Sequence, residues 1–187
     1  GHVDDFSVGC SIRRIVKVVK GQRIPVVMKG FVSDPKGDPP DRAIIEFCCG
    51  QDSIIGQRTK ASDGCRIFRI TEDLDANSSD GFWLASKGCT FQKSLLFSAI
   101  PCTGGSTWSY VNIKHHTAWR KVRAARKVYE KLWTTFERLC KVAHETDTKI
   151  AIEWPSGCIY WNKPAVKKLI EEYRLEPVKF HGCAIGV

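Results

Sequence analysis

Short apolar runs bounded by turn residues recur along the chain and predict four buried strands. They cover residues 43–48, 65–70, 95–100 and 150–153, and glycine, proline or an acidic residue follows each within two positions. Apolar runs of this length, rich in β-branched and aromatic residues, are typical of buried strands. A fifth strand is expected over residues 178–187.

Two stretches have the periodicity of helices. Between residues 117 and 145, apolar side chains recur every three or four positions, which indicates one buried face of a long helix. Pro164 predicts the start of a second helix that ends at Tyr173, because proline is favoured in the first turn. A short helix through Gln57 is expected after the first strand. The apolar face of the long helix contains Trp119, Val122, Ala125, Tyr129, Leu132, Phe136, Leu139 and Ala143.

Alternating strands and helices predict an α/β fold: a Rossmann-like three-layer sandwich with a mostly parallel sheet. We assign this domain to residues 41–187. Residues 1–40 are expected to form a basic N-terminal arm or added strands, and they end in a loop with three prolines between Asp34 and Pro40.

Charge narrows the class of partner. The 187-residue chain has a net charge of +9 and a pI near 9.2, which favours a polyanion such as DNA or RNA, although a solvated basic surface is the alternative. No apolar run approaches the roughly 20 residues that span a membrane, so no membrane partner is expected. The N-terminus does not resemble a signal peptide, and we expect an intracellular location, nuclear or cytoplasmic.

The nine cysteines do not follow a disulfide or zinc pattern. Their number is odd and no Cys-x-x-Cys occurs. Several lie inside apolar stretches, where a free cysteine behaves as a small buried hydrophobe. We therefore expect no metal.

Residues that could bind a ligand or take part in catalysis follow the predicted strands. The first strand leads into Cys49-Gly50-Gln51-Asp52, the second into Glu72, and the third into Pro101-Cys102, while Glu153 ends the fourth. In a parallel sheet these ends share one edge, where ligands bind. The chain lacks Gly-x-Gly-x-x-Gly and Gly-Lys-Ser/Thr, which favours a cofactor without a pyrophosphate. S-adenosylmethionine is such a cofactor, and an acidic residue at the second strand end suits its ribose.

These segments resemble, in the same order, the cytosine-C5 DNA methyltransferases. In that family a strand leads into a glycine-containing turn, a later strand ends in Pro-Cys, and the next ends in a glutamate motif. Here the corresponding segments are 45–50, 100–102 and 152–155. Thr103 stands where the family has glutamine. The chain is too short for the family's separate target-recognition domain, so the resemblance implies a minimal catalytic core that needs its basic faces, or an additional recognition subunit or domain.

The resemblance implies a role for each of these residues. Cys102 is the nucleophile that adds to cytosine C6, and Glu153 is the carboxyl group at N3. Substrate-binding residues are Thr103, Ser106 and Trp161, with Trp108 as a stacking platform. The cofactor-binding residues are Glu46, Phe47, Cys48, Cys49, Gly50, Asp52, Ser53, Glu72, Asp73 and Pro101.

Two other functions stay open at this point. The chain could be a catalytically inactive methyltransferase-like module that binds nucleic acid or a protein partner through its basic faces. It could also be a cysteine-dependent hydrolase in which Cys102 works with His115, His116 or His181, although only residue type supports that reading.

Overall fold

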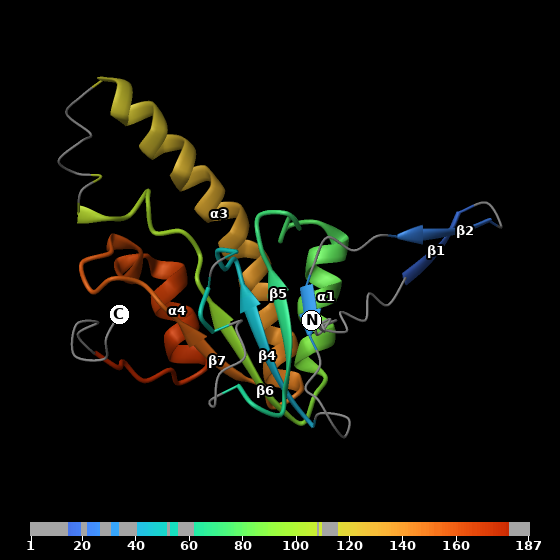
Figure 1. Ribbon diagram of the computed structural model, residues 1–187. Coiled ribbons are helices and arrows are strands. Elements are labelled where there is room, and N and C mark those ends of the chain that lie inside the picture. Colours follow the sequence, from blue (N-terminus) through green and yellow to red (C-terminus); the bar gives the residue numbers. More distant parts are fainter. Residues whose placement is uncertain are drawn as a thin grey trace, which may run out of the picture.

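The computed structural model describes residues 41–51, 53–55, 62–107, 109 and 116–179 (Figure 1). Residues 116 and 117 are described as backbone only. Three short N-terminal strands are also described as backbone: β1 (Ile15–Val19), β2 (Gln22–Val26) and β3 (Phe31–Ser33). β1 and β2 pair antiparallel in a sheet of their own.

The main sheet has four parallel strands and one antiparallel edge strand. The parallel strands are β4 (Arg42–Phe47), β5 (Cys65–Ile70), β6 (Lys93–Ser98) and β7 (Lys149–Ile152). The spatial order is β3-β5-β4-β6-β7, and β3 pairs antiparallel with β5. The sheet therefore includes residues that precede position 41.

Helices α1 (Ser79–Cys89) and α3 (His116–Glu145) pack on the same face of the sheet. Gly88 of α1 lies against the side chain of Ile45, and Phe136 of α3 lies 5.7 Å, ring centre to ring centre, from Phe47. Ile45 and Phe47 point to the same side of β4 because they are two positions apart. These contacts form the apolar core.

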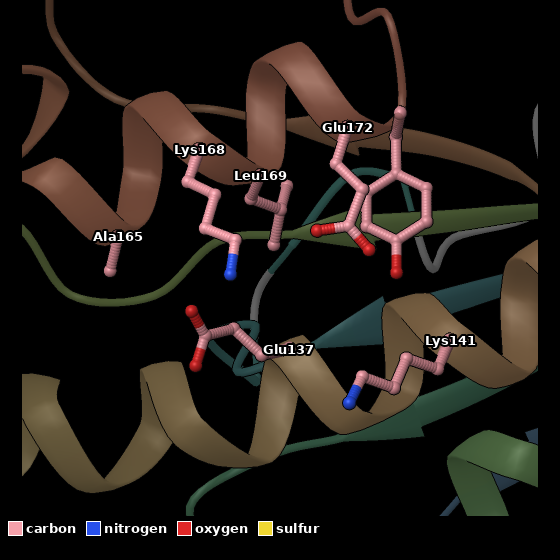
Figure 2. A pocket seen from close by; sticks show the side chains of 7 residues that line it. Glu137, Lys141, Ala165, Lys168, Leu169 and Glu172 are labelled. Carbon is pink, nitrogen blue, oxygen red and sulfur yellow. The ribbon is translucent and has the colours of Figure 1, made fainter.

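A short 3-10 helix η1 (Ile159–Asn162) precedes α4 (Pro164–Glu172). α4 lies alongside α3, and Figure 2 shows side chains of the two helices facing each other across a cavity. Beyond the end of α4, the ring of Tyr173 meets that of His144 at 5.5 Å.

The α/β class and the mostly parallel sheet are confirmed, and the arrangement is consistent with a Rossmann-like fold. Of the three expected layers, the described residues supply the sheet and the helical layer on one face. The strand at 65–70 matches the predicted bounds, and the other three parallel strands begin and end one or two residues earlier than expected. Of the helix expected through Gln57, Ile54 and Ile55 are described and are not helical, and the remainder lies outside the described residues. Most of the segment 178–187 also lies outside them, and its described residues, Val178 and Lys179, are not in a strand.

Helix α1 was not predicted from the sequence. Its N-cap is regular, since the Ser78 side chain accepts a hydrogen bond from the Gly81 amide. Its two internal glycines lower helix propensity and conceal the pattern. Packing requires both: a Cβ on Gly81 would lie 2.3 Å from the Asp75 carbonyl oxygen, and one on Gly88 would lie 2.3 Å from Ile45 Cγ1.

None of the helices in the described part of the chain is both long and apolar enough to cross a membrane.

Candidate functional site at the carboxyl edge of the sheet

The four parallel strands end at one edge of the sheet, as the sequence predicts. Phe47 is in register with Ile70 on one side and with Ser98 on the other. Ser98 is in register with Ile152 of the outermost strand. The segments that follow these strands therefore lie side by side, and we call this region the carboxyl edge.

The chain changes direction between β4 and β6. From β4 it moves to β5 on one side, then passes back across β4 to β6 and continues to β7. Connections on the two sides of such a switch point diverge, and ligands of open α/β sheets bind in the crevice between them. Here the segment after β4 meets the segment after β6, and the amide of Ala99 donates a hydrogen bond of 2.9 Å to the carbonyl of Phe47.

The turn after β4 starts with an unusual backbone conformation. Cys48 has a φ of 64°, in the left-handed region that residues other than glycine rarely adopt. Non-glycine residues are held there only where the surroundings fix them. The side chain of Cys48 is half-buried against the core.

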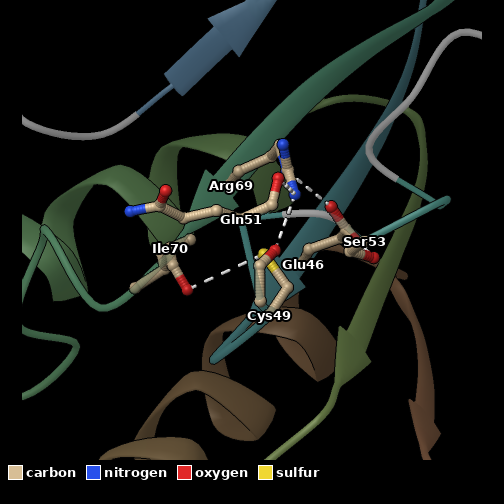
Figure 3. A network of polar contacts seen from close by, with 7 residues as sticks. Glu46, Cys49, Gln51, Ser53, Arg69 and Ile70 are labelled. Carbon is tan, nitrogen blue, oxygen red and sulfur yellow. Dashed lines mark hydrogen bonds and ion pairs between the residues drawn. The ribbon is translucent and has the colours of Figure 1, made fainter.

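A buried ion pair fixes this turn (Figure 3). The guanidinium of Arg69 on β5 donates from Nε to Oε2 of Glu46 on β4 at 3.0 Å. Its Nη2 donates to the carbonyls of Gly50 at 2.7 Å and Gln51 at 3.0 Å. The hydroxyl of Ser53 donates to the other carboxylate oxygen of Glu46. One arginine thus holds both the strand and the turn.

The end of β5 places its two acidic side chains in solvent. Asp73 accepts a hydrogen bond of 2.8 Å from Nε2 of Gln51, which links this end to the turn after β4. Glu72 is exposed beside it. Its carboxylate is in position to accept hydrogen bonds from a ligand at the edge.

The loop after β6 is anchored from several elements. The indole of Trp154 donates to the carbonyl of Ile100 at 2.7 Å, and Nε of Arg126 donates to the carbonyl of Gly104 at 2.9 Å. A Cβ on Gly104 would lie 2.5 Å from the hydroxyl of Tyr160, and one on Gly105 would lie 2.9 Å from the same ring. The two glycines are needed for this close approach.

Cys102 lies in this anchored loop and is half-buried. Its carbonyl accepts a hydrogen bond of 2.8 Å from the amide of Gly105. Cys158 is its electrostatic neighbour, and burial raises the pKa of the Cys158 thiol. Cys102 and the exposed Glu153 both lie near the buried thiol of Cys158, and therefore near each other.

The cysteines of the first turn are poor nucleophiles. Burial strongly raises the pKa of Cys48, and it raises the pKa of Cys49 to about 11. A thiol that stays protonated at neutral pH neither attacks nor binds metal readily. Of the cysteines near the switch point, Cys102 is the one whose position suits chemistry.

The predicted site residues divide into a rim of exposed or half-buried residues and a buried support. Phe47 and Cys49 are buried, and the Glu46 carboxylate is buried in its ion pair with Arg69. Trp161 is half-exposed and donates from Nε1 to the carbonyl of Pro155 at 3.1 Å. Asp52 and Trp108 lie outside the described residues. The rim comprises Gly50, Ser53, Glu72, Asp73, Pro101, Cys102, Thr103, Ser106 and Glu153.

Sequence reasoning missed two arginines that organise this edge, Arg69 and Arg126. A signal for Arg69 existed: a single acidic residue in the apolar run 43–47 and a basic residue in the run 67–70 suggest a pair across neighbouring strands. Nothing in the sequence distinguishes Arg126, because several neighbouring residues on the long helix are also basic.

Two cavities lined by described residues lie away from this edge. One of about 170 Å³ lies between α3 and α4 and is lined by charged side chains that include Glu137, Lys168 and Glu172. The other, about 340 Å³, adjoins the start of β7 near Ile150. Neither contains a residue of the carboxyl edge. Among the described residues, no three His, Cys, Asp or Glu side chains gather as a metal site would require.

No protein-family model matches the chain, and neither the curated proteins nor the solved structures contain a significant match.

Proposed function

We propose that the chain is an S-adenosylmethionine-dependent methyltransferase that acts on nucleic acid, at C5 of cytosine. The observation that carries the proposal is the switch point between β4 and β6, which brings the turn after β4 beside the Pro101-Cys102 loop. A cofactor seated there would lie between a glycine-containing turn and a thiol.

The rim is suited to a nucleoside with a short charged tail. Gly50 is exposed and has no side chain to obstruct a ligand, while Glu72 offers a carboxylate to a ribose diol. We assign the contacts with the cofactor to the rim residues Gly50, Ser53, Glu72, Asp73 and Pro101. Glu46 acts indirectly, through the arginine that shapes the turn. S-adenosylmethionine would supply an electrophilic methyl group.

The half-buried Cys102 is the proposed nucleophile toward the base. Its thiolate forms a bond to C6 of cytosine, and the electron pair of the C5–C6 double bond moves toward C5, which becomes able to attack a methyl group. The carboxyl group of Glu153 gives a proton to N3 and so neutralises the charge that builds on the ring. C5 would then take the methyl group, and the electron pair of the former methyl–sulfur bond would stay on sulfur. Water would accept the C5 proton, the C5–C6 double bond would re-form, and the bond between Cys102 and C6 would break to restore the thiolate. The proton on N3 would return to Glu153.

The anchored loop supports this role because a nucleophile works best in a fixed position. Trp154, Arg126 and Tyr160 hold the backbone on both sides of Cys102. Thiol placement then depends on side-chain rotation alone, which reduces the entropy lost on reaching the reactive geometry.

The test uses purified protein with tritiated S-adenosylmethionine and an oligonucleotide that contains 5-fluorocytosine. We expect methyl transfer to cytosine and a covalent complex with the fluorinated base that survives denaturation. Cys102→Ala should abolish both, whereas Cys158→Ala, which removes the neighbouring buried thiol, should retain them. Methyl transfer that persists in Cys102→Ala would overturn the nucleophile assignment.

Cofactor binding is tested separately from chemistry. A ligand at 100 times its dissociation constant stabilises the folded state by about 2.7 kcal/mol, which a thermal-shift assay detects. Stabilisation by S-adenosylhomocysteine that is lost in Glu72→Ala supports the proposal. Absence of stabilisation in the wild type would leave the alternative of a non-catalytic nucleic-acid-binding module.

A further inference from the structure

We infer that the N-terminal half of α3, residues 118–131, is a docking surface for single-stranded nucleic acid that leads to the Cys102 loop. This inference deepens the proposed function and rests on it for the choice of a nucleic-acid partner. We call these residues the basic segment.

Charge is distributed unevenly along α3. The basic segment contains six arginines and lysines and a single acidic residue, Glu130. The C-terminal half, residues 132–145, contains two basic and two acidic residues if histidine is counted as neutral. Solubility alone does not require that positive charge be concentrated at one end of a helix. A local excess of positive charge attracts polyanions.

The basic side chains form a stripe opposite the buried face. Val122 and Tyr129 are buried and mark the side that faces the protein. At 100° per residue, Arg120, Lys127 and Lys131 lie on the opposite side, and all three are exposed. From 120 to 131 the stripe is about 16 Å long, the length of several nucleotides in a strand.

An exposed aromatic residue accompanies the stripe. Trp119 has 44% of its surface accessible, and the guanidinium of Arg123 lies 5.2 Å from its ring centre. An aromatic ring beside a basic stripe is the combination with which proteins bind unpaired nucleotides, because phosphates meet the cations and a base stacks on the ring. A polypeptide of acidic residues alone, such as polyglutamate, offers carboxylates to the cations but no ring to stack on Trp119.

The basic segment leads from the carboxyl edge. Figure 1 shows α3 projecting past that edge at its N-terminal end. Arg126, inside the segment, donates to the carbonyl of Gly104, two residues from Cys102. At 100° per residue, Trp119 and Arg123 lie between the stripe and Arg126. A strand that crosses the helix from the stripe over these two residues would therefore reach the loop that holds the proposed nucleophile. This path would also replace part of a separate recognition domain.

The test is fluorescence anisotropy with a labelled single-stranded 20-mer at several salt concentrations, without cofactor. The triple variant Arg120→Gln, Arg123→Gln, Lys127→Gln should bind at least about tenfold more weakly at 0.1 M salt. Its slope of log K against log salt should be smaller in magnitude by about 2, since each phosphate contact on a single strand contributes about 0.7. Trp119→Ala should weaken single-strand binding at least about fivefold and duplex binding less.

The matched control is the triple variant Lys87→Gln, Lys141→Gln, Lys167→Gln, which removes the same charge from other exposed helical positions. It should retain wild-type affinity within about twofold. Equal weakening by both triple variants would overturn the inference, because net charge alone would then explain binding. Displacement of the oligonucleotide by polyglutamate at an equal concentration of charge would overturn the choice of nucleic acid.

Cofactor binding by the same variants tests the basic segment and the rim independently. The basic-segment variant should retain thermal stabilisation by S-adenosylhomocysteine, because its changes lie outside the rim. Loss of that stabilisation in the triple variant would contradict a docking role separate from the cofactor site. A wild-type protein that binds S-adenosylhomocysteine but no single strand would overturn the inference alone.

Discussion

The carboxylate of Glu46 and the guanidinium of Arg69 meet at 3.0 Å between neighbouring strands, with the Glu46 side chain fully buried and that of Arg69 only 11% exposed. The pair sits directly before the turn after β4. Arg69 also binds two carbonyls of that turn, so an interaction inside the sheet determines the shape of the candidate cofactor site.

Removal of Arg69 is expected to be costly. Arg69→Met would leave the Glu46 carboxylate buried without its cation, and loss of one partner of a buried pair costs about 3–5 kcal/mol. The double variant Glu46→Met, Arg69→Met should be less destabilised than Arg69→Met alone, because no uncompensated charge remains. Urea denaturation at pH 7 measures both, and a double variant that is the less stable of the two would contradict this account of the pair.

The anchored loop gives a steric prediction. Gly104→Ala places a methyl group against the Tyr160 hydroxyl and the backbone of Arg126, and we expect a loss of about 1–3 kcal/mol. The Tyr160 hydroxyl is buried and has no hydrogen-bond partner among the described residues, so Tyr160→Phe should be neutral or stabilising. Thermal melts of the two variants test this, and a Tyr160→Phe variant as unstable as Gly104→Ala would contradict the packing described.

Buried thiols give a pH prediction. Burial raises the pKa of Cys89 to about 11, so the folded state holds its proton more tightly than the unfolded state does. The stability from this group is complete below its ordinary pKa near 9 and is lost as pH rises toward 11. Between pH 9 and 11 the free energy of unfolding of the wild type should fall as pH rises. Under reducing conditions, Cys89→Ala should make this slope shallower by up to about 1.4 kcal/mol per pH unit. Parallel declines in wild type and variant would show that Cys89 does not contribute.

Thiol accessibility tests the placement of the proposed nucleophile. Cys102 is half-buried, whereas Cys89 and Cys140 are fully buried and have raised pKa values. Alkylation of the native protein with iodoacetamide, followed by peptide mass spectrometry, should modify Cys102 well before those two. If Cys102 were alkylated as slowly as Cys140, its thiol would be inaccessible and could not be the nucleophile.

Local sequence patterns predicted much of the fold, since the parallel strands are short apolar runs and the long helix has a buried face from Val122 to Ala143. The same pattern placed Trp119 on that face, which is wrong: 44% of its surface is accessible, because α3 projects past the carboxyl edge at its N-terminal end. Helix α1 escaped prediction because Gly81 and Gly88 serve tertiary contacts at the expense of helix propensity. The shared carboxyl edge followed from the α/β alternation. The α/β alternation did not predict which candidate residues are accessible to a ligand, because pairing across strands determines that accessibility. Glu46, for example, is buried in its ion pair with Arg69 and cannot contact a ligand.

The proposed methyltransferase activity requires that a cofactor bind at the switch point between β4 and β6. Hydrogen–deuterium exchange with and without saturating S-adenosylhomocysteine tests it directly, peptide by peptide. We expect slower amide exchange in residues 48–55 and 99–106, with no change over the cavity between α3 and α4. Unchanged exchange at both segments, or protection confined to that cavity, would contradict it.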